Sequence, residues 1–239
     1  MDYGAIPYLN IERCSTIPIW SILPLHKIQT TMQAITSILT KCSIKSSLIA
    51  TMINLSLFSQ TIRLAKLTPG IKLDPITFSE DLYAIERDLL FASNEQQIHL
   101  LVYDLLVSNA LRVGALLYVK SILHEFPHSV IGPSILLSQL QELLSQVLLD
   151  FTTTPATKDV LRWLGMIGAM LAQTEDVRDW FLGFLQGKFG IDGFDGESCH
   201  FFTRDSILKD LLSLENMWDV RMDVDQVWRR LGRASLEGS

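Results

Sequence analysis

The sequence has few charged residues and almost no strand-forming patterns, and it lacks the motifs that mark the large enzyme classes. Only 19% of its 239 residues are charged, whereas 48% are hydrophobic. A chain this apolar can bury a large core, so disorder and low-complexity classes are excluded for most of it. We expect a single domain over residues 1–239, with an N-terminal extension at 1–24, an internal linker at 152–156 and a flexible tail at 234–239.

Cysteine and histidine patterns that hold metals are also missing. The three cysteines lie far apart and show no CxxC spacing. We therefore expect neither a disulfide framework nor a structural zinc site. A histidine pair at metal-binding spacing is interrupted by Pro127. We therefore expect reduced thiols, no metal and no cofactor. The cysteines are Cys14, Cys42 and Cys199.

The sequence contains no glycine-rich phosphate loop, no Gly-x-Ser-x-Gly nucleophile elbow and no His-Glu-x-x-His zinc box. Glu80, Asp81, Glu86 and Asp88 do gather within nine positions, but their spacing does not match a divalent-metal motif. We interpret these four acids as a charged, solvated helix face.

Charge is unevenly distributed along the chain. Residues 1–72 carry seven Lys/Arg and two acids, a net charge of +5, so the total of −6 leaves −11 for the remainder. Binding a nucleic-acid phosphate backbone needs clustered Lys and Arg side chains, whereas the basic residues of this chain are dispersed. We expect no direct nucleic-acid binding by this chain.

The longest apolar window, residues 98–119, is long enough to cross a bilayer but contains charged and amide side chains. Asp104, Asn109 and Arg112 would be costly at the centre of a membrane. We expect a buried helix of a soluble protein and no membrane contact.

Hydrophobic periodicity is helical along the chain, and hairpin signals are absent. The sequence therefore predicts an all-α fold, an orthogonal or layered multi-helix bundle of about nine helices. Thr77 or Ser79 is expected to cap the third helix, and Pro127 with the Gly132-Pro133 pair to end the fourth. The expected helices span residues 25–40, 46–67, 77–91, 95–126, 134–149, 157–172, 176–189, 204–214 and 223–231.

The helix expected at 95–126 is apolar on nearly every face, which is typical of a central helix. Asp104, Ser108 and Arg112 follow one another at four-residue spacing and share one stripe of it. Asp104 and Arg112 stand about 12 Å apart along the axis, too far to pair directly. One interpretation makes this stripe the solvent edge of the helix, or a surface satisfied by neighbouring helix ends.

The other interpretation is a ligand pocket with polar groups on the stripe and aromatic walls. The chain would then hold a small apolar effector, or it would be a cofactor-free cyclase or isomerase of secondary metabolism that orients an apolar substrate. As an enzyme it would use Asp104, Arg112, Tyr103 and Tyr118. The pocket candidates are Tyr103, Asp104, Arg112, Tyr118 and Trp163.

Four short blocks, in a fixed order between about residue 98 and the end, share a pattern with one known family. They are ALRVGALLYV with the later LHEFP, LRWLGMIGA, the DWF that follows Arg178, and a terminal tryptophan pair at Trp218 and Trp228. Together they resemble the fungal-specific transcription factor domain of binuclear zinc-cluster regulators.

The resemblance implies a helical regulatory module in the nucleus, with the cytoplasm as an alternative, that controls a gene set such as a biosynthetic cluster. It also implies that the module acts through protein partners. A separate possibility is self-association, in a scaffold that dimerises through the apolar face of the helices in residues 25–67. The six closely spaced cysteines of the zinc cluster are absent here, so DNA binding is not carried over. No catalytic residue is carried over either, because the family has none.

Overall fold

The computed structural model describes residues 17–91, 102–122, 131–147, 154–189, 226–227 and 229–230. Within these ranges the chain is helical and has no β-strand, which confirms the expected all-α class. Seven α-helices and one 3₁₀ helix are found there, so the expected count of about nine is not confirmed. The predicted helix at 204–214 and most of that at 223–231 lie outside the described residues.

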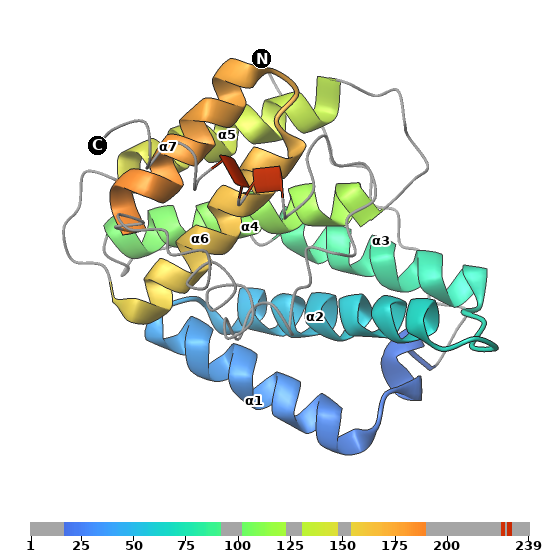
Figure 1. Ribbon diagram of the computed structural model, residues 1–239. Helices are drawn as coiled ribbons and strands as arrows, with labels where there is room; N and C mark the ends of the chain where they lie inside the picture. The colour runs from blue at the N-terminus through green and yellow to red at the C-terminus, as the bar shows by residue number, and fades with distance from the viewer. Residues whose placement is uncertain are drawn as a thin grey trace, which may run out of the picture.

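The elements are arranged in layers (Figure 1). Helices α1 and α2 lie along one edge of the molecule, α4 runs through its middle, and α6 and α7 cover the opposite side. The bounds are η1 Ile19–Ile22, α1 Leu25–Lys41, α2 Ser46–Leu67, α3 Pro75–Phe91, α4 Val102–Ile122, α5 Ile131–Val147, α6 Pro155–Leu171 and α7 Glu175–Phe189.

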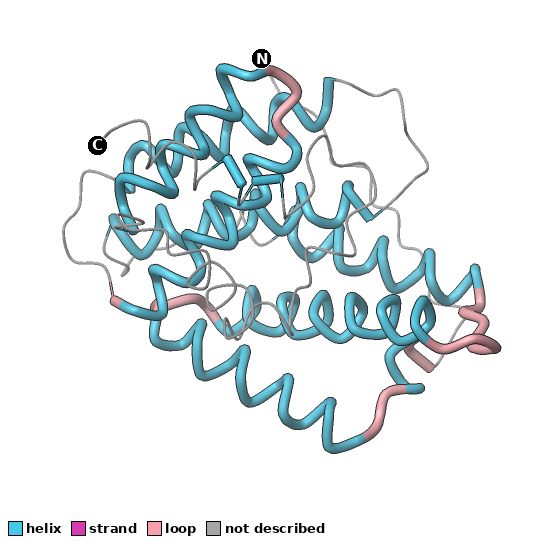
Figure 2. Tube along the Cα trace, viewed as in Figure 1, coloured by secondary structure: helices cyan, strands magenta, loops and turns pink. Residues whose placement is uncertain are grey.

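Consecutive helices pack against each other in pairs: α1 with α2, α4 with α5, and α6 with α7. Loops join α1 to α2, α2 to α3 and α6 to α7 (Figure 2). The pairs are connected because α4 also packs on α3 and α6, and α1 also packs on α6. One hydrophobic core results, with contributions from all seven helices.

Two helices are buried on every face over part of their length. In α2 this part is residues 55–62, and in α4 it is residues 113–119. Both helices are long and apolar enough to cross a membrane by length and composition, but most of each lies inside the fold. This burial is the property of a central core helix.

Helix starts differ from expectation where a side chain or a proline sets them. α3 begins at Pro75, because the Asp74 carboxylate accepts hydrogen bonds from the backbone N–H of Thr77 (2.8 Å) and from its hydroxyl (2.7 Å). The predicted cap at Thr77 or Ser79 is therefore wrong. These bonds also lower the pKa of Asp74.

Two prolines lie in the first turn of a helix, although the sequence predicts both to lie between helices. α5 begins at Ile131, so Pro133 stands in its first turn, where a missing N–H costs nothing. The prediction that the Gly132-Pro133 pair precedes a helix beginning at residue 134 is corrected, because the pair lies within the first turn of α5. α6 begins at Pro155 with Thr154 as its N-cap, inside the stretch 152–156 expected to be a linker.

Glycines allow three helices to approach closely. A Cβ atom at Gly114 of α4 would overlap Leu164 of α6, and one at Gly168 of α6 would overlap the Phe181 ring of α7. At Gly165 a Cβ would stand 2.7 Å from the Leu185 Cδ2. The contacts of α6 with both α4 and α7 thus require positions that have no side chain.

We expect Gly168→Ala to lower the free energy of unfolding by about 1–3 kcal/mol, because the fully buried Phe181 ring must move. Gly183→Ala is the matched control, since nothing lies within 4 Å of a Cβ at this exposed position of α7. It should raise stability by about 0.5–1 kcal/mol through helix propensity. Urea unfolding of both variants measures this, and equal effects would contradict the close approach of α6 and α7.

Candidate functional site

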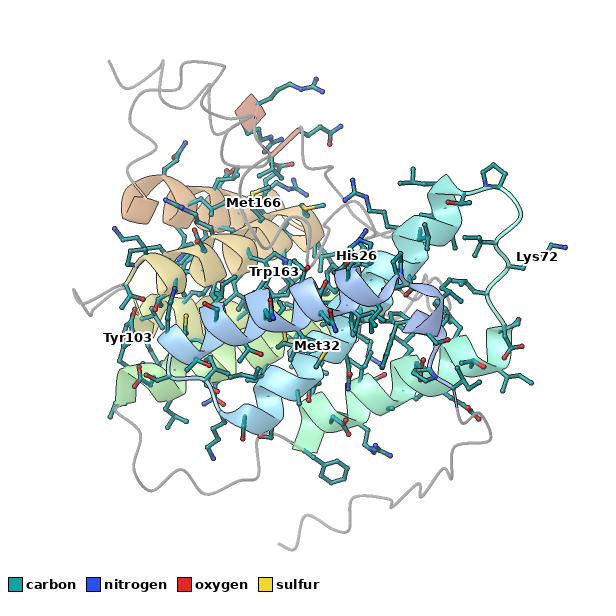
Figure 3. All side chains as sticks on the ribbon, turned by 90° about the horizontal axis from the view of Figure 1, so that it is seen from below. His26, Met32, Lys72, Tyr103, Trp163 and Met166 are labelled. Carbon is teal, nitrogen blue, oxygen red and sulfur yellow. The ribbon has the colours of Figure 1, made fainter. Side chains whose placement is uncertain are left out.

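The structure brings two of the predicted pocket residues together in the core. Tyr118 is completely buried, and its ring centroid lies 5.8 Å from that of Trp163. The Tyr118 hydroxyl is 2.7 Å from the Ser59 Oγ, in a hydrogen bond between α4 and α2. Trp163 is surrounded by helices, whereas Tyr103 lies away from it near the start of α4 (Figure 3).

The polar stripe of α4 is partly covered. Asp104 and Arg112 are half-buried, and Ser108 between them is buried. No ion pair joins Asp104 to Arg112 within the described part of the chain, as their separation along the helix requires. The two interpretations of this stripe, a solvent edge of the helix and the polar side of a ligand pocket, both stay predictions.

Arg112 is the residue of this stripe that has a buried hydrogen-bond donor without an acceptor in the described part of the chain. Its Nε atom is buried and has no hydrogen-bond partner among the described residues. Burial lowers the pKa of its guanidinium, because removal from water destabilises the charged form.

Asp104 lies near the C-terminal end of α1. This end closes with Ser43 at a φ of 56° and with backbone bonds from Ser43 to Thr40 (3.1 Å) and from Ile44 to Leu39 (3.0 Å). That pairing is a Schellman motif, which ends a helix with one left-handed residue.

The Cys42 thiol lies at the C-terminal end of α1, where Cys42 is the C-cap. It is free and buried, and the Thr157 hydroxyl of α6 lies 3.8 Å from its Sγ. Burial is the largest effect on the pKa of Cys42 and raises it. The hydrogen bond from Thr157 comes next and lowers it, and the negative charges of Asp159 and Asp104 raise it by smaller amounts. A protonated thiol is a weak nucleophile, so this group does not have the properties of a catalytic cysteine. Cys14 and Cys199 lie outside the described residues.

Arg178 connects α6 to α7. It is buried, its Nη2 donates to the carbonyl of Ala172 at the end of α6 (2.7 Å), and its Nη1 donates to Glu175 (2.5 Å). Glu175 also accepts from Arg230 (2.5 Å), and this bond is the largest cause of a lowered pKa at Glu175. The arginine of the DWF block thus holds two helix ends together.

Two buried polar residues were not predicted. Asp81, assigned above to a solvated acidic face, is only 5% exposed, and its Oδ2 accepts from the backbone N–H of Ile19 at 2.6 Å. Gln60 of α2 donates from its Nε2 to Thr31 of α1 (2.9 Å) and to Ser56 (3.2 Å). A glutamine in the middle of a long, mainly apolar helix was the available signal for Gln60. The burial of Asp81 depends on a partner 62 positions away.

The bond between Tyr118 and Ser59 can be tested by a double-mutant cycle. Tyr118→Phe should lower the free energy of unfolding by about 1–2 kcal/mol, because the Ser59 hydroxyl is left buried without its partner. The double variant Tyr118→Phe/Ser59→Ala should be more stable than the sum of the single losses predicts. Strict additivity in chemical denaturation would show that the two hydroxyls do not interact.

Comparison with known proteins assigns a family. The family described as the fungal specific transcription factor domain matches residues 44–236, which include α2 to α7. This match extends towards the N-terminus beyond the four blocks identified in the sequence. No curated protein and no solved structure matches the chain. Since the match covers well over half of the sequence, the chain belongs to the fungal-specific transcription factor domain family.

Proposed function

We propose that the chain is the regulatory module of a fungal transcription regulator, and that it acts in the nucleus by contacting other proteins rather than by catalysing a reaction. The observation that carries this proposal is the use of buried polar side chains within the described helices. They bond across helix pairs: Tyr118 to Ser59, Gln60 to Thr31, and Arg178 to the end of α6. Catalysis needs polar groups that remain directed at a substrate.

The same observation bears on the alternative, a cofactor-free cyclase or isomerase. That mechanism would require the Tyr118 hydroxyl to face a substrate, whereas this hydroxyl bonds to Ser59 inside the core. Tyr103, its second aromatic candidate, lies away from Trp163 (Figure 3). These placements favour the module over the enzyme.

Arg112 is the residue through which we expect a partner to be recognised. Burial destabilises the charged form of the Arg112 guanidinium, and a carboxylate that reaches the exposed part of this half-buried side chain would offset that cost. The proposed partner is therefore a protein that presents an acidic side chain to the Asp104–Arg112 stripe of α4. Self-association and a small effector are the other outcomes that the test below distinguishes.

The proposal extends to control of a gene set such as a biosynthetic cluster. Membership of the family supports a role in transcription, and the choice of genes is supported by the resemblance alone.

A reporter assay tests the function. The whole chain, fused to an unrelated DNA-binding domain in a fungal cell, should change reporter expression relative to that domain alone. Arg112→Ala should reduce the change while the fusion stays folded, because the partner loses its charged contact. Arg87→Ala is the control, since Arg87 is exposed and its ion pair with Asp88 contributes little.

The outcomes separate the alternatives. A stable fusion that leaves the reporter unchanged contradicts the module. A reporter effect that is retained in Arg112→Ala contradicts Arg112 as the contact. The mass of the purified chain in solution identifies self-association, and native mass spectrometry identifies a retained small molecule.

A further inference from the structure

The sequence contains two Thr-Pro dipeptides and no Ser-Pro dipeptide. Thr68-Pro69 and Thr154-Pro155 are each followed by a lysine four positions after the threonine, Lys72 in the first case. A threonine followed by proline is what proline-directed protein kinases accept, because the proline has no N–H that must be satisfied when its ring enters an apolar pocket. At the level of sequence the two sites are equivalent, but the fold treats them differently.

Thr68 lies at the beginning of a surface loop. α2 ends at Leu67 and α3 begins at Pro75, so the residues after Thr68 are not helical. The Thr68 backbone is extended, with φ −116° and ψ 100°, and the turn that follows closes through one long bond of 3.3 Å between the Ile71 N–H and the Thr68 carbonyl. A kinase that binds an extended segment must break this bond and the bond from the Thr68 N–H to the Leu64 carbonyl (3.0 Å) at the end of α2, but no side-chain cap.

The Thr68 side chain is half-buried. Its hydroxyl has no hydrogen-bond partner among the described residues, and Leu67 and Pro69 on either side of it are exposed. Lys72 on the same loop extends away from the body of the molecule (Figure 3). Lys66 is exposed as well, so two ammonium groups lie close in sequence to this hydroxyl.

Thr154 is more exposed than Thr68, but its hydroxyl is engaged in hydrogen bonds. Its Oγ1 caps α6, accepting from the Thr157 N–H at 3.2 Å and bonding to the Thr157 hydroxyl at 2.8 Å. Pro155 is the first helical residue, and the Lys158 N–H donates to the Thr154 carbonyl at 2.9 Å. An extended conformation here requires the loss of the cap and of the first turn of α6.

We propose that Thr68 is a phosphorylation site for a proline-directed protein kinase, and that Thr154 is protected by its role as a helix cap. In the reaction the Thr68 Oγ1 attacks the γ-phosphorus of ATP, the bond from that phosphorus to the oxygen of ADP breaks, and the hydroxyl proton passes to the carboxylate base of the kinase. The products are phosphothreonine and ADP.

The modification would change the surface at the end of α2. A phosphate carries a charge of about −1.5 to −2 at neutral pH, and it would lie between Lys66 and Lys72 in the basic N-terminal third of the chain. A negative charge at a helix C-terminus is unfavourable, so the two lysines offset that effect. This inference does not depend on the proposed function, because it concerns a loop far from the stripe of α4.

The test is phosphorylation of the whole folded chain by an active proline-directed kinase with ATP, followed by peptide mapping in a mass spectrometer. Thr68 should be modified at least roughly tenfold faster than Thr154, the factor expected from one helix cap. Two synthetic peptides, covering residues 62–74 and 148–160, should be modified at similar rates because neither keeps the fold. Thr68→Ala and Pro69→Ala should each remove nearly all phosphate from the folded chain.

Three results would contradict the proposal. Equal rates at the two threonines of the folded chain would overturn the protection of Thr154. A peptide pair that already shows the full preference would assign it to sequence rather than to fold. An unmodified Thr68, in the folded chain or in its peptide, would overturn the site itself.

Discussion

Burial of α4 on every face is the constraint on which the rest of this fold depends. A helix with no solvent-facing side over residues 113–119 must satisfy each polar group inside the protein and must accept neighbours all around. The Tyr118 hydroxyl does so through Ser59 of α2. Gly114 lets α6 come close, and Lys120 near the end of α4 pairs with Glu86 of α3. The neighbours of α4 are thus positioned by its own residues.

The blocks that resemble the family can be understood through this packing. Gly114 and Tyr118 belong to the first block, and they make the contacts of α4 with α6 and α2. Gly165 and Gly168 belong to the second, and they admit α7. Arg178 in the third connects the end of α6 to α7. In the described residues these patterns therefore specify how helices pack.

Periodicity was sufficient for the parts of the fold that depend on local sequence. The bounds of α1 and α2 agree with prediction within one residue, because Pro24 and the Thr68-Pro69 turn delimit them. The start of α3 was missed because an aspartate took the capping role from the hydroxyl residues that follow it.

Long-range contacts could not be read from the pattern. Asp81 looked like one of several surface acids, and its burial follows from the backbone of Ile19, which packs across it. Tyr118 and Trp163 could be proposed as neighbours from their helices, but the bond to Ser59 depends on how α2 crosses α4. That the buried Nε of Arg112 lacks an acceptor among the described residues likewise becomes clear only from the positions of the surrounding helices.

Hydrogen–deuterium exchange of the folded chain, followed by mass spectrometry, tests most directly whether α4 is the centre of the structure. The account predicts that backbone amides of residues 113–119 exchange only through global unfolding, together with those of residues 55–62 in α2, whereas α1 exchanges earlier through local opening. Exchange in residues 113–119 that is as fast as in α1 would contradict it.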